Sequence, residues 1–251
     1  MIEQIHMKEF MVPNKIENSK EGSHERAEYL RIMEEYFHGS KKFDDMVEEI
    51  EKMVKMSVSD EKNIMSNINE PVIFISNHPK LDLSLSIPAE KIQNVKGVNA
   101  FDFDRFNYPL IRQLMLRKLL KRPFVTVSLD NGWREAMDEC WHIIITRGSM
   151  NRFDEIMRQY TPGNSLVIFP EGRSTGEADV FPFKSGFFHL AQALNFNKIV
   201  LGVSSPVFSL HENNSIDIID SLDVPSSCEN YREFISNVQE KIYTELIKIH
   251  K

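Results

Sequence analysis

The sequence predicts an α/β protein in which a mostly parallel central sheet is flanked by helices and preceded by an N-terminal helical hairpin. From Pro71 onward, short apolar runs rich in β-branched residues recur along the chain, and helical stretches separate them. Alternation of this kind is typical of a parallel sheet, whose ligands gather at the carboxyl ends of the strands. Before this region, apolar residues recur at helical spacing in two adjoining segments, residues 23–39 and 43–54, which predicts the hairpin.

The predicted elements follow one another in a simple order. A polar arm and the hairpin occupy residues 1–66, and the α/β domain occupies residues 67–251. Helices are also predicted at residues 105–122, from Ser185 onward and at residues 229–251, where apolar residues keep helical spacing. The predicted strands are residues 72–76, 95–101, 124–129, 142–146, 165–169 and 198–203.

Composition and charge exclude several classes of function. The formal net charge of −7 argues against nucleic-acid binding by the whole surface. Cys140 and Cys228 are far apart in the sequence and form no CxxC pair, so we expect neither a disulfide framework nor a thiolate metal site. We therefore expect the protein to be in a reducing compartment. Because there is no apolar leader and no long apolar run, we predict no signal peptide or membrane span. The expected location is cytoplasmic, either soluble or peripheral at the inner face of the membrane.

One stretch, residues 164–191, carries the features of a binding site. Its apolar beginning reads as a buried strand that ends in a turn at a proline and a glycine. One acid and two basic residues follow this strand, namely Glu171, Arg173 and Lys184. A helix begins at Ser185, and the first N–H groups of a helix favour an anion. The stretch therefore predicts a phosphate site.

Polar residues from two other strand ends are expected at the same edge of the sheet. Asn77 and His78 follow the first predicted strand, and Arg147 follows the strand at 142–146. Asp82 lies close to His78 in the sequence. The Asp82 carboxylate could accept a hydrogen bond from one ring N–H of His78, which would leave the other ring nitrogen basic. Such a base can activate a hydroxyl group.

Four segments together resemble the sequence blocks of the glycerolipid acyltransferase superfamily, which includes the lysophosphatidic acid acyltransferases. The resemblance covers roughly residues 71–206. In chain order, the segments are NHPKLD, ITRGSMNRF, IFPEGRSTGEADVFPFKSGFFHLA and IVLGVSSP.

The resemblance implies a set of roles. His78 would be the general base that takes the proton of the acceptor hydroxyl, and Asp82 would orient it. The acyl donor would be a thioester of coenzyme A or of acyl carrier protein. The acceptor would be a phospholipid-type alcohol such as lysophosphatidic acid. Neither a metal nor a cofactor would be required. Backbone N–H groups near Gly172 or in the first block would stabilise the oxyanion. The residues implied to bind the acceptor are Asn77, Arg147, Glu171, Gly172, Arg173 and Lys184.

Two blocks are one residue shorter than the family pattern. Three residues separate His78 from Asp82 where the family has four, and Leu83 stands where the family has the aspartate. In the third block, Arg173 follows Gly172 directly, without the usual threonine. A second interpretation is therefore a non-catalytic protein of the same fold that binds a lipid or an acyl carrier.

A serine hydrolase or thioesterase is a third interpretation. Residues 172–176 match the G-x-S-x-G pattern around Ser174, and Asp217 or Asp220 and then His250 follow in the order of an α/β-hydrolase triad. The context differs, because a nucleophile elbow needs a strand, a tight turn and an immediate helix. We therefore interpret Ser174 as a turn residue or a phosphate contact.

The helix predicted at residues 105–122 is both basic and amphipathic. It contains six basic residues and no acid, and its apolar residues keep helical spacing. One interpretation is a peripheral contact with anionic lipid. The other interpretation is a helix that packs its apolar stripe on the sheet.

Overall fold

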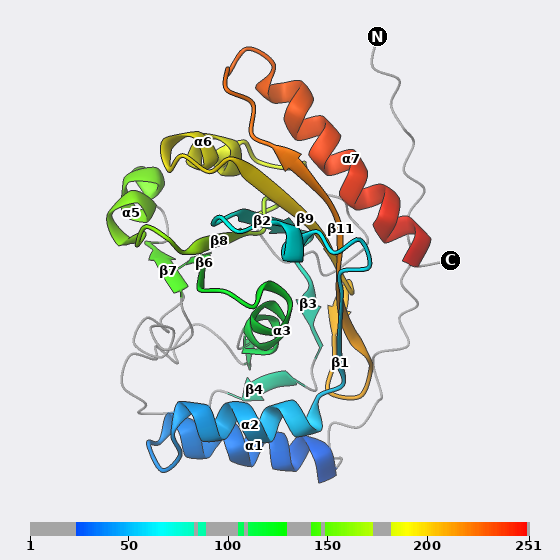
Figure 1. Cartoon of the computed structure of the whole chain (residues 1–251). Helices are drawn as coiled ribbons and strands as arrows, with labels where there is room; N and C mark the ends of the chain where they lie inside the picture. Colours follow the sequence, from blue (N-terminus) through cyan, green and yellow to red (C-terminus); the bar gives the residue numbers. More distant parts are fainter. Residues whose placement is uncertain are drawn as a thin grey trace.

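The computed structural model describes residues 24–82, 85–88, 105–107, 110–129, 142–146, 149–172 and 182–249 (Figure 1). The predicted strand at residues 95–101 lies outside these ranges. The same holds for three of the predicted functional residues, Arg147, Arg173 and Ser174, and for His250.

A seven-stranded sheet forms the centre of the molecule, in the order β1-β11-β9-β2-β8-β6-β7. Every neighbouring pair is parallel except β11 and β9, which confirms the predicted α/β fold with a mostly parallel sheet. The strands are β1 (Met56–Ser59), β2 (Ile73–Ser76), β6 (Phe124–Leu129), β7 (His142–Ile145), β8 (Ser165–Ile168), β9 (Lys198–Ser204) and β11 (Asn214–Asp223).

Two small sheets accompany the large one. In the first, β3 (Lys80–Leu81) pairs in parallel with β10 (Val207–Phe208). In the second, β4 (Ser86–Pro88) pairs in antiparallel fashion with β5 (Arg105–Asn107). The first of these pairs joins the segment after His78 to the segment after β9.

Helices cover both faces of the sheet (Figure 1). One face carries α3 (Leu110–Leu120), and the hairpin of α1 (His24–Phe37) and α2 (Phe43–Met53) lies beyond it. The other face carries α5 (Arg152–Gln159), α6 (Gly186–Ala193) and α7 (Tyr231–Ile249). The short 3-10 helix η2 (Met65–Asn67) lies between β1 and β2 in the chain.

The strands alternate between two hydrophobic cores, as the two-residue period of a strand requires. In β2, Phe74 packs into the core with α3 and the hairpin, whereas Ile73 and Ile75 pack into the core with α5, α6 and α7. In β8, Val167 and Leu166 divide in the same way. A sheet buried on both faces explains why these strands are continuous apolar runs in the sequence.

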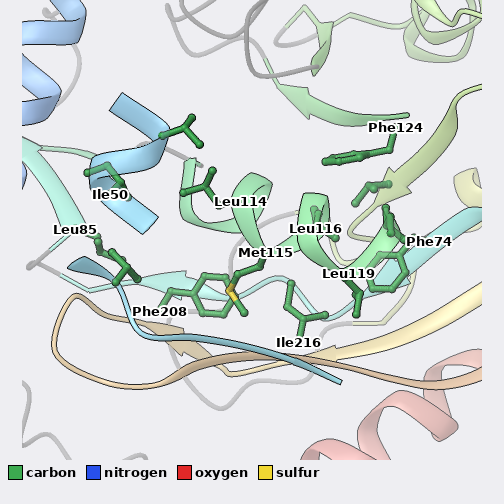
Figure 2. Packing of buried hydrophobic residues seen from close by; sticks show 14 of the residues in the cluster. Ile50, Phe74, Leu85, Leu114, Met115, Leu116, Leu119, Phe124, Phe208 and Ile216 are labelled. Atoms are coloured by element: carbon green, nitrogen blue, oxygen red, sulfur yellow. The ribbon is translucent and has the colours of Figure 1, made fainter. Parts of the chain in front are cut away.

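Helix α3 lies between the sheet and the hairpin, with apolar contacts on both sides (Figure 2). Leu114, Met115, Leu116 and Leu119 are all buried in this core. This burial favours the packed-helix interpretation, while a contact of the basic residues with lipid stays a prediction. The helix is also shorter than predicted, because residues 105–107 form β5.

The basic residues of this region also have roles in the protein itself. Lys118 lies 3.8 Å from Glu51 of α2. Arg122 donates hydrogen bonds to the carbonyl oxygens of Glu70 (2.6 Å) and Met65 (3.1 Å) and so holds the segment that leads into β2. Arg117 and Lys121 are exposed.

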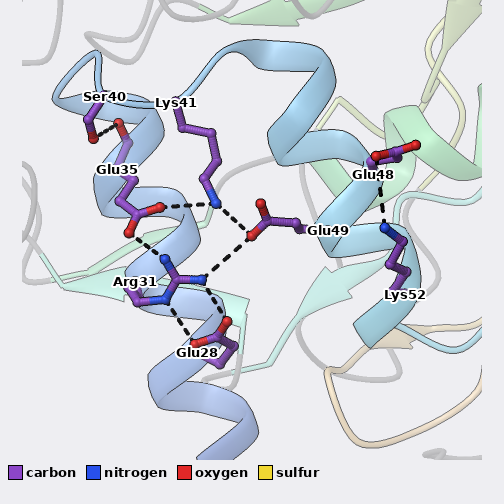
Figure 3. A network of polar contacts seen from close by, with 8 residues as sticks. All are labelled: Glu28, Arg31, Glu35, Ser40, Lys41, Glu48, Glu49 and Lys52. Carbon is purple, nitrogen blue, oxygen red and sulfur yellow. Dashed lines mark hydrogen bonds and ion pairs between the residues drawn. The ribbon is translucent and has the colours of Figure 1, made fainter.

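An ion-pair network joins the two helices of the hairpin (Figure 3). Arg31 of α1 pairs with Glu28 and Glu35 on its own helix and lies 3.6 Å from Glu49 of α2. Lys41, in the turn, lies 3.0 Å from Glu35 and 2.5 Å from Glu49. Because most of these groups are solvent-exposed, each pair contributes on the order of 0–1 kcal/mol, and the buried apolar faces contribute most of the packing energy.

The hairpin shares its core with the α/β domain. Tyr29, Met33 and Ile50 belong to the same buried cluster as Phe74 and Leu114. Strand β1, which precedes residue 67, pairs with β11 in the large sheet. The division into residues 1–66 and 67–251 stays a prediction.

Candidate active site

The candidate site lies at the carboxyl edge of the central strands. Strands β2 and β8 are parallel neighbours, with Ile75 opposite Ile168. The segments that follow them, which contain His78 and Glu171, therefore emerge side by side. For His78 and Glu171 this convergence was predicted, and it follows from the parallel direction of the two strands. Arg147, which was also expected at this edge, lies outside the described residues.

Asn77 is buried and locks the end of β2 to the end of β9. Its side-chain oxygen accepts a hydrogen bond from the backbone N–H of Ser204 (2.7 Å), and its side-chain nitrogen donates to the carbonyl oxygen of the same residue (3.0 Å). The hydroxyl of Ser76 also donates to the Asn77 oxygen (3.2 Å). These contacts make the Asn77 amide a structural bridge that fixes the backbone immediately before His78.

The backbone and the ring of His78 are each held by a neighbour. Its backbone N–H donates to Oε2 of Glu171 at 2.8 Å. Its ring packs edge-on against Phe169, with 4.9 Å between the ring centroids. Nδ1 lies 3.1 Å from the carbonyl oxygen of Pro79. Because a carbonyl oxygen can only accept a hydrogen bond, this contact places the proton on Nδ1 and leaves Nε2 as the basic nitrogen.

Glu171 is an almost completely buried carboxyl group, with 3% exposure. Its Oε2 holds the His78 backbone, and its Oε1 accepts a 3.4 Å hydrogen bond from the hydroxyl of Tyr243 on α7. Burial raises the pKa of the Glu171 carboxyl to about 7, against the opposite effect of these two hydrogen bonds. Glu171 therefore acts inside the protein, where it joins the first and third sequence blocks.

The turn that carries Glu171 is built from sequence-specific parts. Gly172 donates its backbone N–H to the carbonyl oxygen of Phe169 (3.0 Å), which closes a turn with Pro170 in its second position and glycine in its fourth. Gly172 has φ = 72°, a conformation that favours glycine. A Cβ at Gly172 would lie 2.5 Å from Nζ of Lys184, so the lysine ammonium packs directly over this turn.

Two backbone N–H groups of these segments have acceptors inside the protein. The N–H of Gly172 donates to Phe169, and that of His78 donates to Glu171. Residues 173–181 lie outside the described ranges, so the oxyanion role expected of N–H groups near Gly172 stays a prediction. Lys184 places its positively charged ammonium group at the same turn. The backbone N–H of Lys184 donates a hydrogen bond to the carbonyl oxygen of Pro170 (3.0 Å).

Asp82 follows β3 and is partly buried. Its backbone N–H donates to the carbonyl oxygen of Phe208 (2.9 Å), which fixes the end of the first block beside β10. Its predicted role toward the His78 ring stays a prediction. Near Arg147, Glu155 of α5 accepts a hydrogen bond from the backbone N–H of Thr146 (2.7 Å), which ties the end of β7 to the following helix.

Tyr243 and Ser204 were not predicted to be site residues. Tyr243 contacts Glu171 across 72 positions of the chain. The apolar spacing of its helix indicated only a core helix, so no local signal was present. Ser204 does lie in the fourth block, IVLGVSSP, but its contact with Asn77 becomes visible only when β2 and β9 are known to be neighbours.

Comparisons with known proteins agree with the resemblance seen in the sequence. Residues 109–208 match the family model Acyltransferase, a range that contains the second, third and fourth blocks but not NHPKLD. The fold is similar to the crystal structure of the 1-acyl-sn-glycerophosphate (LPA) acyltransferase PlsC from Thermotoga maritima. That likeness has a TM-score of 0.53 at 14% identity and covers 88% of this chain and 94% of the other. No match to the sequence is found among curated proteins.

Residues 109–208 of this α/β protein are therefore similar to the Acyltransferase family, and the fold of the chain is similar to that of PlsC. Three of the four sequence blocks lie inside the matched range.

Proposed function

We propose that the protein transfers a fatty acyl group from a thioester donor to a hydroxyl of a lysophosphatidic acid-like acceptor, as a step of phospholipid biosynthesis. The donor is an acyl-CoA or an acyl carrier protein thioester. The observation that carries the proposal is the state of His78. Its backbone is tied to a buried acid, and its Nδ1 contacts a carbonyl oxygen, so Nε2 is the basic nitrogen.

In this mechanism, Nε2 of His78 takes the proton of the acceptor hydroxyl while the oxygen attacks the thioester carbonyl. The tetrahedral intermediate then collapses, the carbon–sulfur bond breaks, and the proton passes to the leaving thiolate. The products are the acylated acceptor and a free thiol. No covalent acyl-enzyme is formed, and Asp82 assists by orienting the His78 ring.

The acceptor phosphate is proposed to bind at the turn after β8. Lys184 supplies a positive charge directly over Gly172, and α6 begins two residues later with its N–H groups at that end. Arg147 and Arg173 are proposed to complete the phosphate site, as the resemblance implies. Glu171 contributes by holding His78, and Asn77 by fixing the strand that precedes it.

The test is free-thiol release from acyl-CoA and acyl carrier protein donors, with and without lysophosphatidic acid or glycerol 3-phosphate. We expect acceptor-dependent release in the wild type and its loss in His78→Ala. The matched control is His189→Ala, because His189 is an exposed histidine on α6. Acyl transfer that survives His78→Ala would refute the proposed base.

Other outcomes would favour the alternative functions. Acceptor-independent thiol release that Ser174→Ala abolishes would indicate a thioesterase. Tight binding of lysolipid without thiol release from any donor would indicate the non-catalytic protein of the same fold. In the described structure Asp220, one candidate acid of the hydrolase triad, forms an ion pair with Lys241 at 2.8 Å.

A lipid acceptor also requires the site to meet a lipid layer, and we propose that the edge near β7 does so. Within the described ranges, no helix is both long and apolar enough to cross a bilayer. The large apolar side chains that are exposed in those ranges are Met150 (96%), Phe153 (40%) and Ile247 (38%). Met150 and Phe153 follow β7, at the sheet edge that also carries His78 and Glu171.

Vesicle co-sedimentation tests this contact. We expect Met150→Ser/Phe153→Ser to bind vesicles of anionic phospholipid about tenfold more weakly than the wild type, because two apolar side chains no longer enter the lipid. Ile247→Ser is the matched control, since Ile247 is also exposed but lies near the end of α7. Equal binding by the double variant and the wild type would contradict this placement.

A further inference from the structure

The C-terminal helix α7 holds the third block at two points. The hydroxyl of Tyr243 donates to Oε1 of Glu171 (3.4 Å), and Gln239, one turn earlier, accepts a hydrogen bond from the backbone N–H of Phe183 (3.0 Å). The rings of Tyr243 and Phe183 pack edge-on, with 5.4 Å between their centroids. One helix face therefore contacts the chain before and after residues 173–181.

We propose that Tyr243 is a positioning residue for the reaction, which holds the Glu171 carboxyl so that Glu171 in turn holds the backbone of His78. The proposal rests on the proposed function, because it requires His78 to be the base. It concerns a residue outside the four sequence blocks and outside the matched domain at residues 109–208.

The two carboxyl oxygens of Glu171 have different partners. Oε2 accepts from the His78 N–H at 2.8 Å, and Oε1 accepts from Tyr243. The terminal torsion of a glutamate has a broad energy minimum, so a contact at one oxygen alone leaves the carboxyl plane poorly fixed. A second contact, from Tyr243 on α7, restricts that rotation. The helix thereby helps to fix the His78 backbone, which the Asn77 bridge holds from the side of β2.

The electrostatic surroundings support the same role. The hydrogen bond from Tyr243 favours the ionised form of Glu171 and lowers its pKa, while burial raises it. The titratable groups described around this turn are His78 after β2, Lys184 before α6, and Tyr243 on α7. Removal of the hydroxyl should therefore raise the pKa of Glu171 further and move the acidic limb of the pH profile to higher pH.

Tyr243→Phe separates the hydroxyl from the packing of the ring. Phenylalanine keeps the edge-on contact with Phe183 and loses only the hydrogen-bonding group. Tyr160→Phe is a matched control, because the Tyr160 hydroxyl also donates a hydrogen bond (2.6 Å, to the carbonyl oxygen of Asn164), and its ring also packs edge-on against a phenylalanine, Phe196. That tyrosine follows α5, and within the described ranges the hydrogen bond of its hydroxyl goes to Asn164 and not to a residue of the site.

The experiment compares kcat, KM and the pH profile of acyl transfer in the wild type, Tyr243→Phe and Tyr160→Phe. We expect Tyr243→Phe to lower kcat about three- to tenfold, with little change in KM for the donor, and to shift the acidic limb upward. Tyr160→Phe should leave both quantities unchanged. A Tyr243→Phe enzyme with the kcat and the pH profile of the wild type would overturn the proposal.

A double-mutant cycle excludes a purely structural effect. In a Glu171→Gln background, Tyr243→Phe should have no further effect on the pH profile, because the carboxyl that it tunes is absent. An unchanged effect in that background would also overturn the proposal. Failure of the proposed function looks different, since His78→Ala would then retain acyl transfer. If no donor supports turnover, the same upward shift is measured in the pH dependence of unfolding.

Discussion

The burial of Glu171 predicts a specific pH dependence of stability. Its carboxyl has a pKa of about 7 in the folded protein, against an ordinary value of 4.5. Each pKa unit corresponds to about 1.4 kcal/mol, so ionising this group in the folded protein costs roughly 3 kcal/mol more than in the unfolded chain. A folded-state pKa that is raised means that the stabilising form is the protonated one. Its contribution is complete below about pH 4.5 and is lost as the pH rises through about 7.

Glu171→Gln removes this titration and keeps a side chain of nearly the same shape. We expect the free energy of unfolding of the wild type to fall by about 3 kcal/mol relative to Glu171→Gln between about pH 4.5 and pH 8. Denaturant unfolding of both proteins across this range measures the difference. The reasoning would be refuted if the two curves of stability against pH ran parallel.

Glu155 provides the control for this experiment. It is a solvent-exposed glutamate whose pKa is lowered, first by a hydrogen bond from the Ser149 side chain and then by the Thr146 backbone N–H. A carboxyl group whose pKa is lowered in the folded protein contributes stability at pH values above its ordinary pKa. That contribution is lost as the pH falls through the pKa of the folded protein. Between about pH 5 and pH 8, Glu155→Gln should therefore show a constant difference from the wild type.

Two further predictions concern packing and the bridge before His78. Gly202→Ala would place a Cβ 2.3 Å from Cζ of Phe74. We therefore expect the free energy of unfolding, measured with denaturant, to fall by about 1–3 kcal/mol. Gly186→Ala is the control and should change this free energy far less, because a Cβ there would have no atom within 4 Å among the described residues beyond its neighbours in the chain. Asn77→Ala would leave the buried N–H and carbonyl of Ser204 without the side-chain partner; we expect a loss of about 2 kcal/mol or more, with lower thiol release. If Gly202→Ala unfolded like the wild type, the close contact with Phe74 would be contradicted. If Asn77→Ala did so, the bridge to Ser204 would be contradicted.

Residue patterns alone identified the strands that are buried on both faces. Strands β2, β6, β7, β8 and β9 are continuous runs of β-branched and aromatic residues, and each was predicted within one or two residues. The two strands of the large sheet that were not predicted are less distinctive. β1 (MSVS) is short and partly polar, and β11 alternates aspartate and serine with apolar residues and is half-exposed over much of its length. Their pairing partners, rather than their composition, make them strands.

The sequence by itself determined the resemblance to the acyltransferase blocks, the buried strands of the sheet and the turn at Glu171, because each depends on residues that are close together in the chain. The tertiary structure decided what the site residues do. Polar atoms of Glu171 and Asn77 contact His78, Tyr243 and Ser204, which no local pattern indicated, and the predicted binding of substrate by Glu171 and Asn77 stays a prediction. It also decided that α3 is a core helix, because only the packed hairpin shows that its apolar stripe is covered. Burial and hydrogen-bond partners depend on contacts between distant segments, and no local pattern records them.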